Sequence, residues 1–219
     1  MKYYNWLLKW RFWLGIALLV LAVVVNITSG FWPSFILYFT AVILVAGHFF
    51  IGPMRVIQEY IENGDVDGAK KILASIWFPN LLYKPIRAAY YTLKGQMAMM
   101  DQDFTTAEQH MKQSEKLGLS IPEAEGANKL QLGMLAIQRG DMKQGESYIR
   151  AAIRLGIPDK DSRAMAFLQM CSIYMQKGDI RSMRAAKDFY RKAKAEKPIN
   201  SEVLSQIKQL DKYISRVPG

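Results

Sequence analysis

Residues able to carry reactive chemistry are few in this chain and stand apart from one another. Its 219 residues include two histidines, His48 and His110, and one cysteine, Cys171. A single cysteine forms neither an internal disulfide nor a multi-cysteine metal site, and we expect Cys171 to be a buried packing residue. The chain also lacks a Gly-rich phosphate loop and the HExxH, CxxC and G-x-S-x-G motifs. We therefore predict that the protein is not an enzyme and uses no cofactor or metal.

A basic run near the C-terminal end is suited to non-covalent binding of anions. It carries three acidic residues, Asp179, Asp188 and Glu196, against eight basic ones. The basic residues are Lys177, Arg181, Arg184, Lys187, Arg191, Lys192, Lys194 and Lys197. Such a patch fits anionic lipid headgroups, a nucleic acid or ribosome, or an acidic protein. A solvated helix face is the alternative interpretation.

Four turns recur at a fixed interval and organise the elements around these residues. Their last residues are Asp65, Asp103, Asp141 and Asp179, each 38 positions after the one before. A period of 20–50 residues is typical of stacked repeats. Glycine suits the left-handed end of a first helix, and aspartate caps a second one. The sequence therefore predicts four helix–turn–helix units.

The residues around these turns resemble the tetratricopeptide repeat (TPR) over about residues 52–199. After each turn come a small residue (Ala69, Ala107, Gly145 and, after a small insertion, Ala186), a large one (Leu73, Met111, Ile149, Tyr190) and a mostly small one (Ile76, Ser114, Ala152, Ala193). In the first helices, Tyr60, Gly95, Leu132-Gly133 and Tyr174 match the family pattern, and Pro158 and Pro198 close two repeats. Because the interval between turns is longer than the usual repeat of this family, we expect longer inter-repeat loops.

The resemblance also implies a concave groove lined by the first helices. The corresponding positions here are Gln58, Thr92, Gln96, Met99, Met134, Ile137, Ser172 and Met175. TPRs that hold a terminal carboxylate use Lys, Arg and Asn in the groove, and these positions lack them. Methionines are adaptable and suit apolar protein partners. The other interpretation is that several of the methionines pack between helices.

Residues 1–51 differ in composition from the rest of the chain. No charged residue occurs from Phe12 to Ile27 or from Phe31 to Ile51. Each run is long enough to cross a hydrocarbon core of about 30 Å as a helix. We predict a transmembrane helical hairpin with spans at about 12–28 and 31–51. A signal peptide is disfavoured because the second run follows at once and no small-x-small cleavage site precedes it.

Flanking charges predict the orientation of this hairpin. Lys2, Lys9 and Arg11 precede the first span, Arg55 follows the second, and the connecting loop is uncharged. By the positive-inside rule, both termini are cytoplasmic, which makes the chain a multi-pass protein of the plasma (inner) membrane. We expect Asn26 near the outer headgroups rather than in a helix–helix hydrogen bond, and His48 near the cytoplasmic interface.

The loop from Trp77 to Pro85 is strongly apolar and allows two interpretations. It enters the headgroup region beside the hairpin, or Leu81, Leu82 and Tyr83 fill the seam between the first and second repeats.

The fold class that follows is all-α. Residues 1–51 form the hairpin, and residues 52–219 form a cytoplasmic TPR-like solenoid with turns near 64, 102, 140 and 178. The helices are expected at 54–62 and 66–76, 86–100 and 103–117, 122–139 and 141–155, 161–177 and 180–194, with a capping helix over about 200–215.

Two functions fit this organisation. The first is a membrane-anchored adaptor or scaffold that binds protein partners at the cytoplasmic face, as in a secretion, insertion or envelope assembly. The alternative is a basic docking module that brings a ribosome, a nucleic acid or anionic lipid to the chain.

Overall fold

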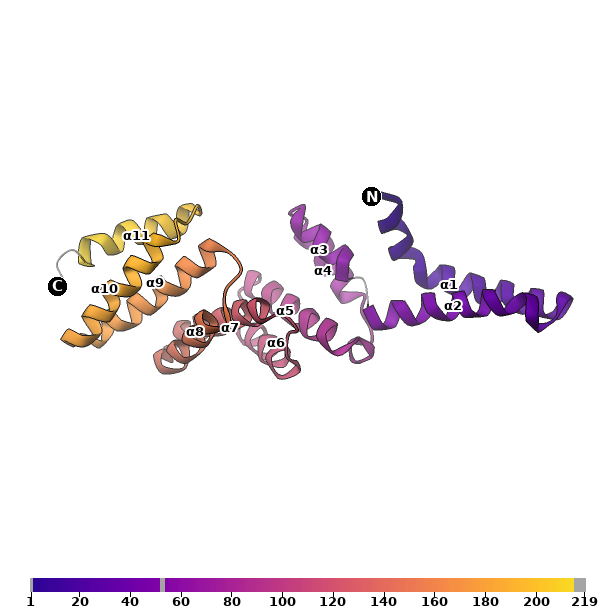
Figure 1. Ribbon diagram of the computed structural model, residues 1–219, viewed down its shortest axis with the longest axis horizontal. Coiled ribbons are helices and arrows are strands. Elements are labelled where there is room, and N and C mark those ends of the chain that lie inside the picture. Colours follow the sequence, from indigo (N-terminus) through magenta and orange to yellow (C-terminus); the bar gives the residue numbers. More distant parts are fainter. Residues whose placement is uncertain (1, 52–53, 215–219) are drawn as a thin grey trace. The chain divides into compact units, whose positions relative to one another are not determined.

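A computed structural model describes the backbone of residues 2–51 and 54–214, and leaves undescribed the side chains of 2–9, 11, 48–51, 54–55, 58 and 62. Over the described backbone the chain forms eleven α-helices, one 3-10 turn and no strand (Figure 1). The helices are α1 (Lys2–Ser29), α2 (Phe31–Ile51), α3 (Met54–Glu62), α4 (Val66–Ala74), η1 (Pro79–Leu81), α5 (Lys84–Met100), α6 (Phe104–Leu117), α7 (Pro122–Gln138), α8 (Met142–Leu155), α9 (Lys160–Lys177), α10 (Ile180–Ala195) and α11 (Ser201–Ile214). The chain divides into two compact units, residues 1–97 and 98–219.

The predicted all-α class is confirmed, with corrections to individual elements. The first apolar run, predicted at about residues 12–28, lies within α1, which begins at Lys2, and α4 ends at Ala74 rather than residue 76. The expectation of long inter-repeat loops is wrong for residues 118–121 and 156–159, which are only four residues each. The long step is filled by helix instead, since α7 has 17 residues and α8 has 14.

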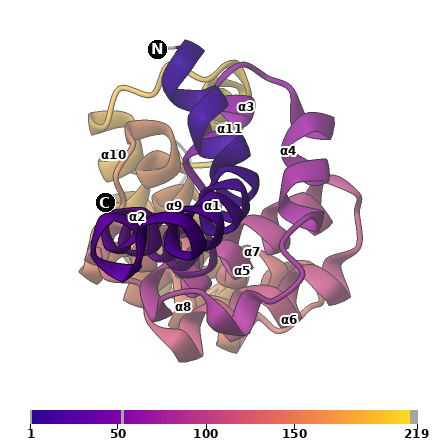
Figure 2. The same cartoon turned by 90° about the vertical axis from the view of Figure 1, so that its right-hand side faces the viewer.

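In the first unit, α1 and α2 lie side by side along a seam of small residues (Figures 1 and 2). Gly15 and Ala22 on α1, and Ser34 and Ala41 on α2, are buried, and each pair is separated by two helical turns. A Cβ atom on Gly15 would lie 2.7 Å from the Cγ2 atom of Val45. Small residues let two apolar helices approach closely enough for their backbones to pack.

The outward faces of α1 and α2 are apolar. The stretch Phe12–Ser29 is long and apolar enough to cross a membrane, and Phe31–Gly47 is a shorter apolar stretch among the described residues. Their exposed large side chains are Trp13, Ile16, Val20, Leu21, Val23, Val24, Ile27, Phe31, Trp32, Phe35, Ile36, Phe39, Val42 and Ile43.

The expectation that Asn26 makes no helix–helix hydrogen bond is wrong. Its Nδ2 atom donates a long hydrogen bond, 3.5 Å, to the Oη atom of Tyr38 on the neighbouring helix. The amide therefore joins α1 to α2. The side chain of His48, placed at the interface from the sequence, lies outside the described residues.

The turns between paired helices share one geometry in three of four cases. Asp65, Asp103 and Asp141 have φ, ψ values of −85°, 77°; −85°, 77°; and −84°, 75°. Their backbone N–H groups donate 2.9 Å bonds to carbonyls five residues earlier, those of Tyr60, Ala98 and Ala136. The residue before each aspartate has positive φ: Gly64, Gln102 and Gly140. A repeated sequence signal has thus produced a repeated backbone conformation.

The fourth turn keeps the cap but not the backbone path. Asp179 has ψ 154°, although its side chain accepts a 3.0 Å bond from the N–H of Ser182, as the other three aspartates do from the third residue after them. The difference accompanies the small insertion before Ala186.

In the second unit, the recurring small and large residues form the core between helices. Ala107, Gly145 and Ala186 are buried, as are Met111, Ile149 and Tyr190. Helices α7 and α8 approach each other closely, because a Cβ atom on Gly145 would lie 2.5 Å from Ile137 and one on Gly133 would lie 2.6 Å from Ile149. Glycine at these positions is required by contact between the two helices.

The helix predicted at about residues 200–215 is present as α11, Ser201–Ile214. The side chain of Asn200 accepts a 2.8 Å bond from the N–H of Glu202 and so caps its N-terminus. Val203, Ile207 and Ile214 are buried against a core shared with α9 and α10. The other face of α11 is mostly polar, with Leu204 and Tyr213 as its exposed large apolar side chains.

Candidate functional surfaces

The positions predicted for a groove are half-buried wherever their side chains are described, and Gln58 lies outside the described side chains. Met99 packs against the core cluster of α6 and α7, Met134 and Ile137 against that of α7 to α9, and Met175 against that of α9 to α11. The methionines of the second unit therefore contribute to packing between helices. Thr92, Gln96 and Ser172 are the polar, half-buried members of the set, and Thr92 donates a 3.3 Å bond to the carbonyl of Ala88.

Two exposed glutamines occupy a position that sequence reasoning missed. Gln138 ends α7 and Gln176 lies in the last turn of α9, so they hold equivalent places in successive repeats. Gln176 also lines a depression of about 530 Å³ between α8 and α9. The other lining residues are Met142, Lys143, Glu146, Ile173 and Lys177. The depression is open, and its lining combines apolar side chains with amide, ammonium and carboxylate groups.

The predicted basic patch lies on α10 and its two ends. The side chains of Arg181, Arg184, Arg191, Lys192 and Lys194 are exposed, as are Lys177 and Lys197, whereas Lys187 is half-buried. The patch is partly compensated: Arg191 lies 3.8 Å from Asp188, and Lys194 lies 3.8 Å from Asp211 of α11. The exposed basic face is therefore strongest toward Arg181 and Arg184.

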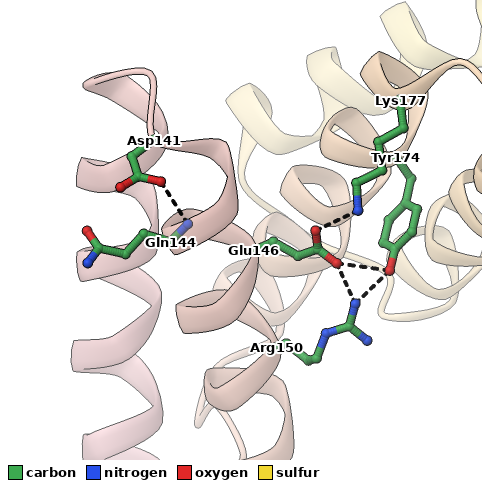
Figure 3. A network of polar contacts seen from close by, with 6 residues as sticks. All are labelled: Asp141, Gln144, Glu146, Arg150, Tyr174 and Lys177. Atoms are coloured by element: carbon green, nitrogen blue, oxygen red, sulfur yellow. Dashed lines mark hydrogen bonds and ion pairs between the residues drawn. The ribbon is translucent and has the colours of Figure 1, made fainter.

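A polar network joins α8 to α9 at the mouth of the depression (Figure 3). The Glu146 carboxylate accepts bonds from Lys177 Nζ at 2.7 Å, Tyr174 Oη at 3.0 Å and Arg150 at 2.5 Å, and Arg150 also donates to Tyr174 Oη at 2.6 Å. The ammonium of Lys177 lies 4.4 Å from the centre of the Tyr174 ring. With three donors around it, this carboxylate has a structural role and is not poised as a general base.

The pKa of Glu146 reflects the same contacts. Burial acts to raise the pKa of this carboxyl, but the hydrogen bonds from Lys177, Arg150 and Tyr174 outweigh burial and hold it below the ordinary glutamate value of 4.5. The carboxylate is therefore ionised at neutral pH, and its negative charge is matched by the two cations beside it.

An equivalent network joins α6 to α7, one repeat earlier in the chain. Glu108 pairs with Arg139 at 2.5 Å and with Lys112 at 2.7 Å. Glu108 corresponds to Glu146, Lys112 to Arg150, and Arg139 to Lys177. Each glutamate follows the buried small residue of its repeat, where the last repeat has Lys187. These residues recur in the sequence at the same interval as the turns. However, each glutamate and its basic partner on the next helix are distant in the chain, so the pairing can be recognised only when the packing of the helices is known.

The loop before α5 presents large apolar side chains to solvent. Trp77 is 83% exposed, Phe78 60%, Leu81 53% and Tyr83 61%, and only Leu82 is buried. The interpretation in which Leu81, Leu82 and Tyr83 fill a seam is therefore wrong for Leu81 and Tyr83. The 3-10 turn η1 directs these side chains outward while Leu82 points inward.

The thiol of Cys171 is shielded from solvent. Cys171 is fully buried in the core between α9, α10 and α11, as expected, and burial raises the pKa of its thiol to about 11. Within the described part of the chain, no group of three or more His, Cys, Asp or Glu side chains is arranged to hold a metal ion.

No protein-family model matches this chain, and no curated protein is significantly similar to it in sequence.

Proposed function

We propose that the protein is a membrane-anchored adaptor of the TPR type. In this proposal α1 and α2 cross the plasma (inner) membrane as a hairpin with both termini cytoplasmic. The helix pairs α3–α4, α5–α6, α7–α8 and α9–α10 form a TPR-like solenoid capped by α11, and this solenoid binds a protein partner at the cytoplasmic face.

The observation that carries the proposal is the repeated backbone of the turns. Three of them, one in each successive repeat, have nearly identical dihedral angles and the same hydrogen bonds. Stacked helix pairs of this kind expose extended surfaces and serve mainly in recognition. The small residues buried where the helices of a pair meet support the assignment to the TPR type.

The membrane anchor is supported by the outward faces of α1 and α2. Val20 is 61% exposed, Ile36 70% and Phe39 58%, on helices whose buried seam consists of small residues. A soluble helix pair buries its large apolar residues and exposes polar ones, which is the reverse. Hydrocarbon is the solvent that fits such a surface.

Orientation is tested by a reporter that is active only outside the cytosol. Fused after Gly219 it should be silent, and inserted at Gly30 it should be active, because the positive-inside rule puts the uncharged connection outside. Activity at the C-terminal end would overturn the cytoplasmic placement of the repeats.

In this proposal the partner surface lies at the exposed ends of α7 and α9. Gln138 and Gln176 are exposed and lie outside the core clusters, whereas Met134 and Met175 are packed against them. Pull-down of the full chain in mild detergent, followed by mass spectrometry, identifies the partners. Replacing Gln138 and Gln176 by Arg should abolish recovery of these partners without changing the melting temperature of the protein. Recovery of the same partners with the double variant would exclude this surface.

The alternative function, basic docking to a ribosome or other nucleic acid, is favoured by one observation. Arg181 and Arg184 are exposed on α10 at a spacing that puts them on one face. Binding through phosphates would weaken steeply with salt because counterions are released. Loss of the partner in Arg181→Gln/Arg184→Gln, together with steep salt dependence, would select this function over the adaptor.

A further inference from the structure

The exposed loop at residues 77–83 is unusual because it is ordered and apolar at the same time. The N–H of Leu81 donates to the carbonyl of Phe78 at 3.0 Å, and that of Leu82 to Pro79 at 3.2 Å. The guanidinium of Arg87 donates to the carbonyl of Asn80 at 3.3 Å and ties the loop to α5. Trp77, Phe78, Leu81 and Tyr83 thus project from a fixed backbone. A contiguous exposed apolar patch on a soluble surface marks a site of interaction.

The charge around this loop indicates what covers it. From Gly68 to Met100 the chain has no acidic residue, and it carries five basic ones: Lys70, Lys71, Lys84, Arg87 and Lys94. Lys71 and Lys84 are exposed on either side of the loop. Basic residues beside exposed Trp, Phe and Tyr are the combination that binds the interface of an anionic bilayer, with aromatic rings at headgroup depth and cations facing lipid phosphates.

We propose that residues 77–83 insert into the cytoplasmic leaflet of the membrane as a third contact besides α1 and α2. The occupant of the patch is the anionic lipid surface, and the inference builds on the proposed hairpin, which holds the same unit at that surface. This contact fixes the first repeat against the bilayer, because a helix pair anchored by one connection alone would be free to rotate.

Depth measurements on the full chain test this proposal. Single cysteines carrying a nitroxide label are placed at three exposed apolar positions in a Cys171→Ala background: Trp77→Cys in the loop, Phe39→Cys on α2, and Ile199→Cys before α11. The protein is reconstituted in vesicles containing phosphatidylglycerol. Collision rates with oxygen, which concentrates in lipid, and with a nickel chelate, which stays in water, then report the environment of each label.

The proposal predicts an oxygen-to-nickel ratio at residue 77 several-fold above that at 199 and below that at 39. It also predicts that the ratio at 77 falls in phosphatidylcholine vesicles and in Lys71→Gln/Lys84→Gln, while the ratio at 39 does not change. Ile199 is the exposed apolar control: it is 81% exposed and follows the basic run at residues 177–197, so it shows whether nearby basic charge alone brings an apolar side chain into lipid.

Each outcome separates this inference from the proposed anchor. A water-like ratio at 77 with a lipid-like ratio at 39 overturns the loop contact and leaves the hairpin intact. A water-like ratio at 39 overturns the hairpin instead. The ratio at 77 then shows on its own whether the loop contacts lipid. A label at 77 that is water-accessible in vesicles but protected in native membranes shows that a protein covers the patch, which also overturns the lipid assignment.

Discussion

The helix pairs α1–α2 and α7–α8 share a close contact at glycine but differ in the side chains that they expose. Both bring two helices together over glycine, with Gly15 facing Val45 in one and Gly133 facing Ile149 in the other. Outside the seam, α1 and α2 expose Val, Ile, Phe and Trp, whereas α7 and α8 expose Lys, Arg and Gln. Close contact at glycine is therefore common to both pairs, whereas the outer face is apolar in one pair and polar in the other.

A second difference lies in what holds the pairs beyond packing. Among the described side chains of α1 and α2, a long amide–phenol bond from Asn26 to Tyr38 crosses between the helices. The α8–α9 seam has a carboxylate with three donors around Glu146 (Figure 3). Ion pairs suit a surface that water screens only partly, and the hydrocarbon proposed for α1 and α2 would make an unpaired charge far more costly.

An arginine introduced at an exposed apolar position should disrupt the first region and leave the second unaffected. Val20→Arg places a charge on the apolar face of α1 and should disfavour membrane insertion by about 3 kcal/mol, because arginine is expelled from the hydrocarbon centre. Ile180→Arg, at a side chain that is 74% exposed, should leave stability unchanged. The fraction of each variant that resists carbonate extraction measures the difference. Equal extraction of both would show that α1 does not cross the membrane.

Adding one methyl group to a glycine tests how tight each seam is. A Cβ atom on Gly126 of α7 would lie 1.9 Å from the carbonyl oxygen of Gly156, which is backbone. Gly126→Ala should therefore lower the free energy of unfolding by about 2–3 kcal/mol. Gly15→Ala should cost less, because the atom it meets is the end of the Val45 side chain. Urea unfolding in detergent, followed by circular dichroism, compares the two; a larger loss for Gly15→Ala would contradict the assignment.

The charged seam of α8 and α9 should depend on pH. Glu146→Gln should lower the free energy of unfolding at pH 7 by about 1–2 kcal/mol, since it leaves two cations without their carboxylate. The folded pKa lies below the ordinary value of 4.5, so the stabilisation is complete above 4.5 and is lost as pH falls below it. The gap between parent and variant should close in acid. A gap that stayed constant from pH 7 to acid would show that the effect is steric.

The smallest effect concerns the one turn of three that lacks glycine. Gln102 has φ 60°, a conformation that glycine adopts without strain, whereas Gly140 occupies the equivalent place at φ 85°. Gln102→Gly should raise the free energy of unfolding by about 0.5–1 kcal/mol, and Gly140→Gln should lower it by a similar amount. Thermal melts of both variants measure these two changes. Because the two turns share one backbone geometry, the changes in stability should have opposite signs.

The sequence predicted the helices well where the signal is local. Asp103 and Asp141 act on amides three residues away, so the ends of α6 and α8 fall within one residue of the expected positions. The loop before α5 was harder, because whether Leu81 and Tyr83 are buried depends on how the surrounding helices pack. The groove positions show the same limit: the resemblance to the TPR family implied a groove that includes Met134 and Met175, but it could not separate groove from core.

The networks around Glu108 and Glu146 also determine the charge that a neighbouring helix needs. Both glutamates receive a basic residue that ends the next first helix, Arg139 or Lys177. In the last pair this position is Lys187, so another helix pair ending in a basic residue would meet like charge there, and α11 already covers the apolar core beside it. The surface beside Lys187 therefore has the opposite charge preference to the surfaces beside Glu108 and Glu146, and a helix that bound it through an ion pair would need an acidic residue at its end.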